Sequence, residues 1–286
     1  MKQLPGWFRL VVRLASIVPP LGTTLAWRLF WSLGTPVPVR PSELETHRRA
    51  RRGTLEVDDA TVVTYEWGSG DRTVLLVHGW RSRASRFAVL IEELVGRGFT
   101  VVSFDAPGNG DSTGTRMDAL QVTSIVQRLA AEHGPLEAIV GHSFGGMPTF
   151  IARRRGVDVA RLVTIASAHN FSAVIDMFAS GIGLPSTRGL HRRSEAWGRE
   201  RGIDIWRTAL AELDPTDTAT PILVVHDAGD REVPLEQAMQ IVEAHTGSVE
   251  TLVTDGLGHH RVLSDPEVVG RIAAFVSGSV SAERRG

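Results

Sequence analysis

The sequence of 286 residues contains no cysteine, and Lys2 is its only lysine. The absence of cysteine excludes a disulfide framework, a thiol nucleophile and any cysteine-ligated zinc or iron–sulfur site. Thirty of the 31 basic residues are therefore arginines, which a coding bias explains better than thirty selected contacts. Because 32 acidic residues balance them to a net charge of −1, the overall charge gives no sign of nucleic-acid binding.

Long hydrophobic runs are also absent near the start of the chain. The longest uncharged stretch there runs from Leu14 to Trp27 and contains Pro19 and Pro20. A membrane-spanning helix needs about 20 apolar residues, so we expect no such helix. The basic residues before this stretch resemble the start of a signal peptide, but no Ala-x-Ala cleavage site follows them.

Tryptophan is concentrated at this end of the chain: Trp7, Trp27 and Trp31 are three of the seven. The apolar residues of 5–33 have helical spacing, with arginines on the other side, so we expect two amphipathic helices hinged at Pro19-Pro20. Three alternatives stay open for them. They lie in a membrane interface, pack on the body of the protein, or join a second subunit in a homodimer.

Residues 34–53 are rich in proline and arginine, as linkers often are, so residues 1–53 are predicted to be N-terminal helices and a linker. From residue 54 to 286 strand and helix patterns alternate, and several strands are continuous apolar runs. This indicates a mostly parallel sheet covered on both faces, whose first strands are candidates for antiparallel pairing. The predicted strands are 61–67, 73–77, 100–104, 136–141, 161–166, 222–226 and 249–254; the predicted helices are 85–97, 117–133, 144–155, 235–244 and 266–277.

The alternation is interrupted once, at residues 167–219. An insert here would lie over the carboxyl ends of the strands, where open α/β sheets bind ligands. We expect it to form a small helical cap whose apolar side chains line an acyl pocket. Phe171, Phe178 and Trp206 are the candidate substrate-binding residues. The cap arginines are more typical of a solvated face than of an anion clamp.

The sharpest local motif is G-H-S-F-G-G at 141–146, between an apolar strand and a helix. This is the context of a nucleophile elbow, in which Ser143 adopts a strained conformation and Gly141 and Gly145 avoid collisions. The N–H of Phe144 would then stabilise an oxyanion at a helix N-terminus. A second donor is the N–H of Trp80, in H-G-W at 78–80; the alternative there is a simple turn.

A nucleophilic serine needs a base, and the base needs an acid to orient it. Candidates for the acid are Asp227 and Asp230, which follow a predicted strand, and candidates for the base are His259 and His260. Asp227 comes directly after the strand, where an aspartate often braces a loop, so Asp230 is favoured. The order along the chain is then nucleophile, acid, histidine.

These motifs resemble the α/β-hydrolase superfamily, in its serine-nucleophile branch, over about residues 55–278. The resemblance implies an eight-stranded sheet, hydrolysis through an acyl-enzyme and no cofactor. It also carries the roles of acid and base to Asp230 and His259. The motifs are H-G-W at 78–80, D-A-P-G-N-G-D-S at 105–112, G-H-S-F-G-G at 141–146, D-x-x-D-R-E-V-P at 227–234 and G-H at 258–259.

We therefore predict a serine hydrolase that cleaves a carboxylic ester or related acyl bond of a small molecule, without a metal ion. Acyl transfer, thioester hydrolysis and a non-catalytic, membrane-associated scaffold are the alternatives. Asp105 and Asp111 are expected to lie in a turn rather than to act in catalysis, with Asp111 and Ser112 satisfying local backbone groups. His78 is expected to bond within the core, and His142 to point away from Ser143. The expected location is cytoplasmic, with peripheral membrane contact through residues 5–33 as one alternative.

Overall fold

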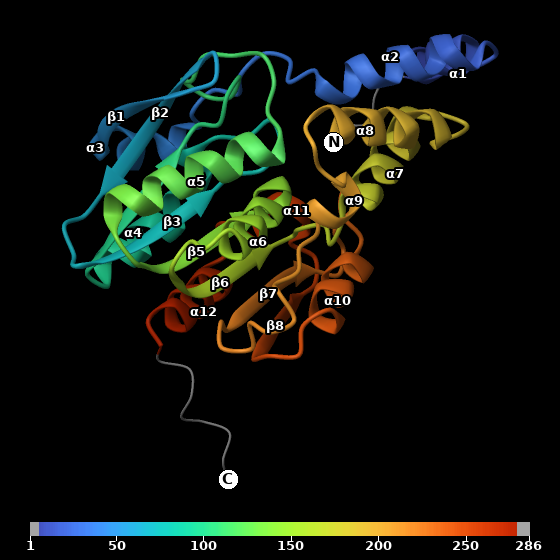
Figure 1. Ribbon diagram of the computed structural model, residues 1–286. Helices are drawn as coiled ribbons and strands as arrows, with labels where there is room; N and C mark the ends of the chain where they lie inside the picture. Colours follow the sequence, from blue (N-terminus) through green and yellow to red (C-terminus); the bar gives the residue numbers. More distant parts are fainter. Residues whose placement is uncertain (1–5, 279–286) are drawn as a thin grey trace.

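The computed structural model of the protein describes residues 6–278, with only the backbone of residues 6–9 and Pro19 (Figure 1). One eight-stranded sheet has the order β1-β2-β4-β3-β5-β6-β7-β8. β1 pairs with β2, and β2 with β4, in antiparallel fashion, whereas all other neighbours are parallel. This confirms the predicted sheet. The strands are β1 (Arg51–Val57), β2 (Ala60–Trp67), β3 (Arg72–Val77), β4 (Phe99–Phe104), β5 (Leu136–His142), β6 (Val159–Ile165), β7 (Ile222–Asp227) and β8 (Val249–Thr254).

Helices cover both faces of the sheet, as the apolar runs predict. Successive residues of the central strands point to opposite faces and enter separate cores: Leu75 and Ile139 enter one, Leu76 and Val140 the other. The first core is completed by α5 (Ala119–His133), α6 (Gly146–Arg154) and α10 (Leu235–Glu243). The second is completed by α4 (Ala88–Gly96) and α12 (Pro266–Val276). Shorter helices are η2 (Ala84–Phe87), η3 (Ser143–Gly145) and α11 (Gly258–Arg261).

The stretch predicted as a linker is partly structured. Residues 41–49 form η1 (Pro41–Glu43) and α3 (Leu44–Arg49), and the predicted boundary at residue 53 falls inside β1. β1 has the sequence RRGTLEV and is exposed along most of its length at the edge of the sheet. A strand of this kind carries almost no hydrophobic alternation, which is why its sequence does not reveal it.

The insert and the N-terminal helices pack on each other (Figure 1). The insert contains α7 (Phe171–Ile182), α8 (Arg188–Glu200) and α9 (Ile205–Thr208). The N-terminal helices are α1 (Gly6–Ala15) and α2 (Pro19–Trp31), with the two prolines at the start of α2. α2 crosses α8 closely, since a Cβ on Gly189 would lie 2.1 Å from Oγ1 of Thr23. The inner side of α1 and α2 therefore packs on the body of the protein.

The outer side of the same helices is apolar and exposed. Leu10, Leu14, Ile17 and Leu21 are each more than half exposed, Ile17 at 75%. Among residues 6–278, no helix is long and apolar enough to cross a membrane.

Candidate active site

Ser143 lies at the sharp turn between β5 and α6. Its φ of +54° is left-handed, which is strained for a residue with a side chain. A Cβ on Gly141 would lie 2.5 Å from the carbonyl oxygen of Gly145, and a Cβ on Gly145 would lie 2.2 Å from that of Val77. Only glycine fits at either position, so the two glycines of the motif permit the turn that presents the half-buried Ser143.

His259 connects Ser143 to an acid. Its Nε2 lies 3.0 Å from Oγ of Ser143, and its Nδ1 lies 2.7 Å from Oδ2 of Asp230. Three residues predicted from separate motifs are thus brought together from the ends of β5 and β7 and from α11. In this arrangement Ser143 can donate its proton to Nε2 while Asp230 accepts from Nδ1–H.

Asp230 and Asp227 have different partners although they are three residues apart. Asp230 also accepts from the N–H groups of Glu232 and Val233, at 2.7 and 3.1 Å. Burial by itself would raise the pKa of Asp230, but His259 and these N–H groups lower it, so the carboxylate is charged. Asp227 instead accepts from the N–H groups of Leu257 and Gly258, at 2.9 and 2.8 Å, and holds the turn that carries His259.

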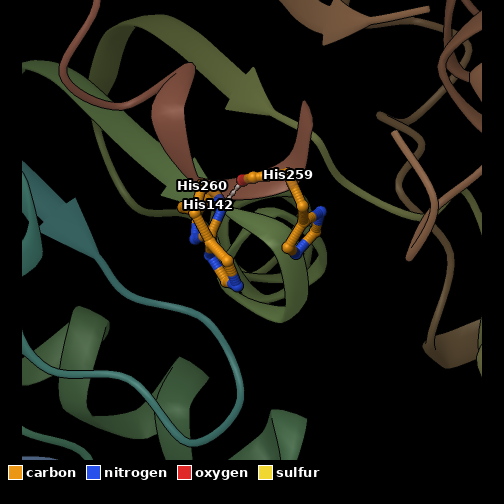
Figure 2. Close-up of side chains that lie close together, drawn as sticks. All are labelled: His142, His259 and His260. Carbon is orange, nitrogen blue, oxygen red and sulfur yellow. Dashed lines mark hydrogen bonds between the residues drawn. The ribbon is translucent and has the colours of Figure 1, made fainter. Parts of the chain in front are cut away.

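Two further histidines flank His259 (Figure 2). His260 is exposed and lies 3.4 Å from a carboxylate oxygen of Glu232, as expected for a surface histidine. His142 is buried, and its Nε2 lies 3.0 Å from the carbonyl oxygen of His259. Burial, together with the nearby His259, lowers the pKa of His142 to about 3, so its ring is neutral and can donate to that carbonyl. The sequence does not reveal this contact with the backbone of the proposed base.

One nitrogen each from His142, His259 and His260 lies within 4.8 Å of the others, which is close enough to consider a metal ion. However, His259 already uses both ring nitrogens, on Asp230 and Ser143. A metal ion held by this cluster would displace one of these two hydrogen bonds of His259.

The loop after β3 also comes close to the nucleophile. A Cβ on Gly79 would lie 2.9 Å from Cβ of Ser143, so only glycine lets the loop come this close. His78 is buried beneath the loop, where its Nε2 accepts from the N–H of Ala106 at 2.9 Å and its Nδ1 lies 2.8 Å from the carbonyl oxygen of Gly79. No backbone carbonyl of the described residues accepts from the N–H of Trp80 or Phe144. Both groups are therefore available as hydrogen-bond donors.

The turn at 105–112 forms a separate polar network away from the serine. Asp105 is fully buried and accepts from the N–H of Ala84 and the hydroxyl of Tyr65, both at 2.8 Å. Arg83, also buried, bridges Asp105 and Asp111, with its Nη2 3.3 and 3.0 Å from their oxygens. Asp105 also accepts from the N–H of Asp111, and the hydroxyl of Ser112 donates to the carbonyl oxygen of Asp105, as expected for Ser112. The carboxylate of Asp111 instead bonds to the side chains of Arg83 and Tyr65, so the expectation that it satisfies local backbone groups is wrong.

The three candidate substrate-binding residues belong to one aromatic cluster that also contains residues of α2. Phe171 is buried, and its ring centroid lies 6.2 Å from that of Trp206. Phe178 lies 5.1 Å from Phe30 of α2, which in turn lies 6.1 Å from Trp80. The sequence left packing on the body of the protein as one of three alternatives for these helices, because contacts across more than 100 residues of chain leave no local pattern.

A mostly parallel sheet with a strained serine after its central strand, linked through a histidine to an aspartate, is the arrangement typical of the α/β-hydrolase class. The chain belongs to the alpha/beta hydrolase family, whose model matches residues 74–272.

Relatives and solved structures agree with this family. The chain is 38% identical over 179 residues to a pimeloyl-[acyl-carrier protein] methyl ester esterase of Sodalis glossinidius, a match that covers 58% of this chain and 65% of that protein. An esterase from Exiguobacterium antarcticum is similar in structure, with a TM-score of 0.60, 18% identity and coverage of 79% of this chain and 100% of the other. A membrane phospholipase A has a TM-score of 0.62 and 18% identity and covers 95% of this chain and 98% of the other. These structures establish the fold.

Proposed function

We propose that the protein is a serine hydrolase that cleaves a carboxylic ester through an acyl-enzyme. The hydrogen-bonded chain from Ser143 through His259 to Asp230 carries this proposal. His259 removes the proton from Ser143 as its Oγ attacks the carbonyl carbon of the ester. His259 then protonates the alcohol that leaves, and activates the water that hydrolyses the acyl-enzyme.

The N–H groups of Trp80 and Phe144 stabilise the tetrahedral oxyanion. Support for this role comes from the approach of Gly79 to Ser143 and from the absence of a backbone acceptor for either group among the described residues. Phe144 also lies in η3, which leads directly into α6, and the N-terminal end of a helix favours negative charge.

The substrate is an ester whose acyl part is apolar. Phe171, Phe178 and Trp206 of the insert 167–219 provide an aromatic environment for it, and the relatives include a pimeloyl-[acyl-carrier protein] methyl ester esterase. No cofactor or metal ion takes part in the proposed mechanism.

Hydrolysis of p-nitrophenyl esters tests the proposal, with Ser143→Ala as the critical variant. We expect the variant to fold and to lose turnover by roughly 10⁵-fold or more. A fluorophosphonate probe should label the wild-type serine and not the variant. Full activity of Ser143→Ala would refute the mechanism, and folded wild-type protein that neither reacts with the probe nor turns over esters would favour the non-catalytic scaffold. Faster turnover of thioesters, or transfer to an added alcohol, would replace ester hydrolysis by thioesterase or acyltransferase activity.

We also propose that the protein contacts a membrane surface through the outer side of α1 and α2. Of the eight large hydrophobic residues that are exposed in the described part of the chain, six lie between Leu10 and Leu21. An apolar patch of this kind marks an interaction site. The first 42 residues contain no aspartate or glutamate, and Arg13 and Arg28 are exposed, so an anionic lipid surface is favoured over a second copy of the chain. The predicted cytoplasmic location stays a prediction.

Flotation with vesicles of phosphatidylcholine and phosphatidylglycerol tests this contact in the full chain. Ile17→Asp with Leu21→Asp should abolish vesicle binding, whereas Val89→Asp, an exposed valine on α4, should not. Sedimentation velocity distinguishes membrane contact from the alternative, in which this face joins two subunits in a homodimer. If the wild type dimerises without lipid and the double variant is monomeric, the face is a subunit interface and the membrane proposal is wrong.

A further inference from the structure

The last turn of α2 lies against the loop that carries Trp80. Phe30 is 8% exposed, and its ring stacks on the indole of Trp80 with an interplanar angle of 27°. Trp31 lies 6.4 Å from the same indole and stacks on Trp197 of α8 at 5.7 Å. The side chain of Trp80, whose N–H is a proposed oxyanion donor, is thus covered by α2.

A polar contact joins the same two segments. Nη2 of Arg81 donates to the carbonyl oxygen of Ser32, the residue that ends α2, at 2.7 Å. A guanidinium at this position also interacts favourably with the negative end of the helix dipole. Arg81 has a φ of +50°, a left-handed conformation that costs energy for a residue with a side chain and persists only where its surroundings hold it.

The loop is consequently held from two sides. His78 binds its inner side to the turn after β4, and Phe30 with Ser32 binds its outer side to α2. Between these contacts the loop passes so close to Ser143 that there is no room for a Cβ at position 79. A displacement of α2 would therefore move the N–H of Trp80 relative to Ser143.

The aromatic cluster that begins next to Ser143 continues onto α2. Trp80 and Phe144, whose ring centroids are 5.5 Å apart, are both partly exposed beside the serine. From Trp80 the cluster passes to the largely buried Phe30, whose ring centroid lies 5.8 and 5.1 Å from those of Phe171 and Phe178 of α7. An acyl chain that leads away from the carbonyl along these rings would meet α2 before it meets the insert.

We infer that the C-terminal end of α2 is a functional part of the active site. Phe30 forms a wall for the aliphatic acyl chain of the substrate, and Arg81 is a positioning residue that keeps the Trp80 N–H in place through its bond to Ser32. This inference rests on the proposed ester hydrolysis at Ser143. It assigns to the N-terminal helices a task in specificity and turnover that is separate from membrane contact.

The rates of hydrolysis of p-nitrophenyl acetate, butyrate, octanoate and decanoate test the proposed contact between Phe30 and the acyl chain. Phe30→Ala should reduce kcat/KM for the longer esters by roughly tenfold more than for the acetate, because only the longer chains reach the ring. Trp27→Ala is the matched control, since Trp27 is an aromatic residue of the same helix that contacts Phe30 and Trp31 but not Trp80. It should leave the chain-length preference unchanged. Phe30→Leu serves if Phe30→Ala does not fold, with a smaller loss of the same sign.

Separate measurement of kcat and KM tests the role of Arg81 as a positioning residue. Arg81→Met should lower kcat for every ester by roughly tenfold, with KM little changed and with slower labelling of Ser143 by the fluorophosphonate probe. Arg81→Lys should restore part of kcat, because an ammonium group can also donate to the carbonyl of Ser32.

The outcomes separate this inference from the proposed function. If Ser143→Ala is inactive while the Phe30 and Arg81 variants keep the wild-type chain-length preference and kcat, the inference is wrong and the hydrolase proposal stands. If Ser143→Ala retains activity, the proposed function itself fails.

Discussion

Gly79 and Ser143 follow different strands, β3 and β5, yet a Cβ on Gly79 would lie 2.9 Å from Cβ of Ser143. The loop after β3 is therefore pressed against the proposed nucleophile, and the smallest side chain cannot be inserted between them. Since the N–H of Trp80 follows directly, the distance between this donor and Ser143 depends on the glycine.

This contact predicts the effect of Gly79→Ala. The methyl group would push the loop away, and we expect kcat for p-nitrophenyl butyrate to fall by about 10²-fold or more. Gly270→Ala in α12 is the matched control, because a Cβ there meets no atom within 4 Å. It should keep full activity and stabilise the protein by about 0.5–1 kcal/mol. Wild-type kcat in Gly79→Ala would contradict the proposed place of Trp80 in the oxyanion hole.

The two aspartates after β7 should respond differently to loss of charge. Asp230→Asn should lower kcat by roughly 10³–10⁴-fold while the melting temperature changes little, because an amide cannot hold His259 as the carboxylate does. Asp227→Asn should mainly lower the melting temperature, because the turn at Leu257 and Gly258 loses a charged acceptor. Steady-state kinetics and calorimetry on both variants check this. The reverse pattern would make Asp227 the acid.

His142 should make the stability of the protein depend on pH. Burial lowers its pKa to about 3 in the folded state, whereas in the unfolded chain it is near 6.5. Between these values the unfolded chain binds the extra proton, so stability is fully present above pH 6.5 and falls as the pH drops toward 3. Urea unfolding from pH 7 to pH 4 should give a slope of up to about 1.4 kcal/mol per pH unit from this residue. His142→Asn should have a smaller slope, and equal slopes would disprove the prediction.

The buried pair of Arg83 and Asp105 should matter for stability rather than for chemistry. Asp105→Asn leaves the guanidinium without its fully buried partner, and we expect a loss of about 3–5 kcal/mol in the free energy of unfolding. The partly exposed pair of Arg97 and Glu93 is the control, since Glu93→Gln should cost at most about 0.5 kcal/mol. Chemical denaturation measures both. A cost for Asp105→Asn as small as that for Glu93→Gln would mean that Asp111 alone satisfies Arg83.

Most of the sheet is predictable from sequence because its strands are short apolar runs between turn residues. The predicted strand at 73–77 and the helix at 266–277 agree with β3 and α12 to within a residue at each end. β1 escapes prediction because an exposed edge strand needs few apolar residues. Its ladder with β2, from Arg51 and Glu66 onward, forms through backbone hydrogen bonds that place little demand on side chains.

The candidate active site also has one part that the sequence predicts and one part that it does not. The elbow is local, because Gly141, Ser143 and Gly145 are neighbours in the chain and their collisions follow from one turn. The choice between Asp227 and Asp230 is not local. It depends on which carboxylate faces His259 across 29 residues of chain, and the structure places Asp230 there and Asp227 on backbone N–H groups.

The sequence by itself determined the alternating α/β architecture, the elbow at Ser143 and the absence of cysteine chemistry, because hydrophobic periodicity, glycine sterics and residue type act over a few residues. Only the tertiary structure decided where the N-terminal helices lie. Their amphipathic pattern was compatible with a membrane, a second subunit or the body of the protein. The structure buries Ala26 and Phe30 against the insert and leaves Ile17 and Leu21 exposed. Helical spacing shows which side of a helix is apolar but not what packs on that side. The free energy of burial depends on the apolar area removed from water, and any segment of the chain, a second subunit or a lipid can cover that area.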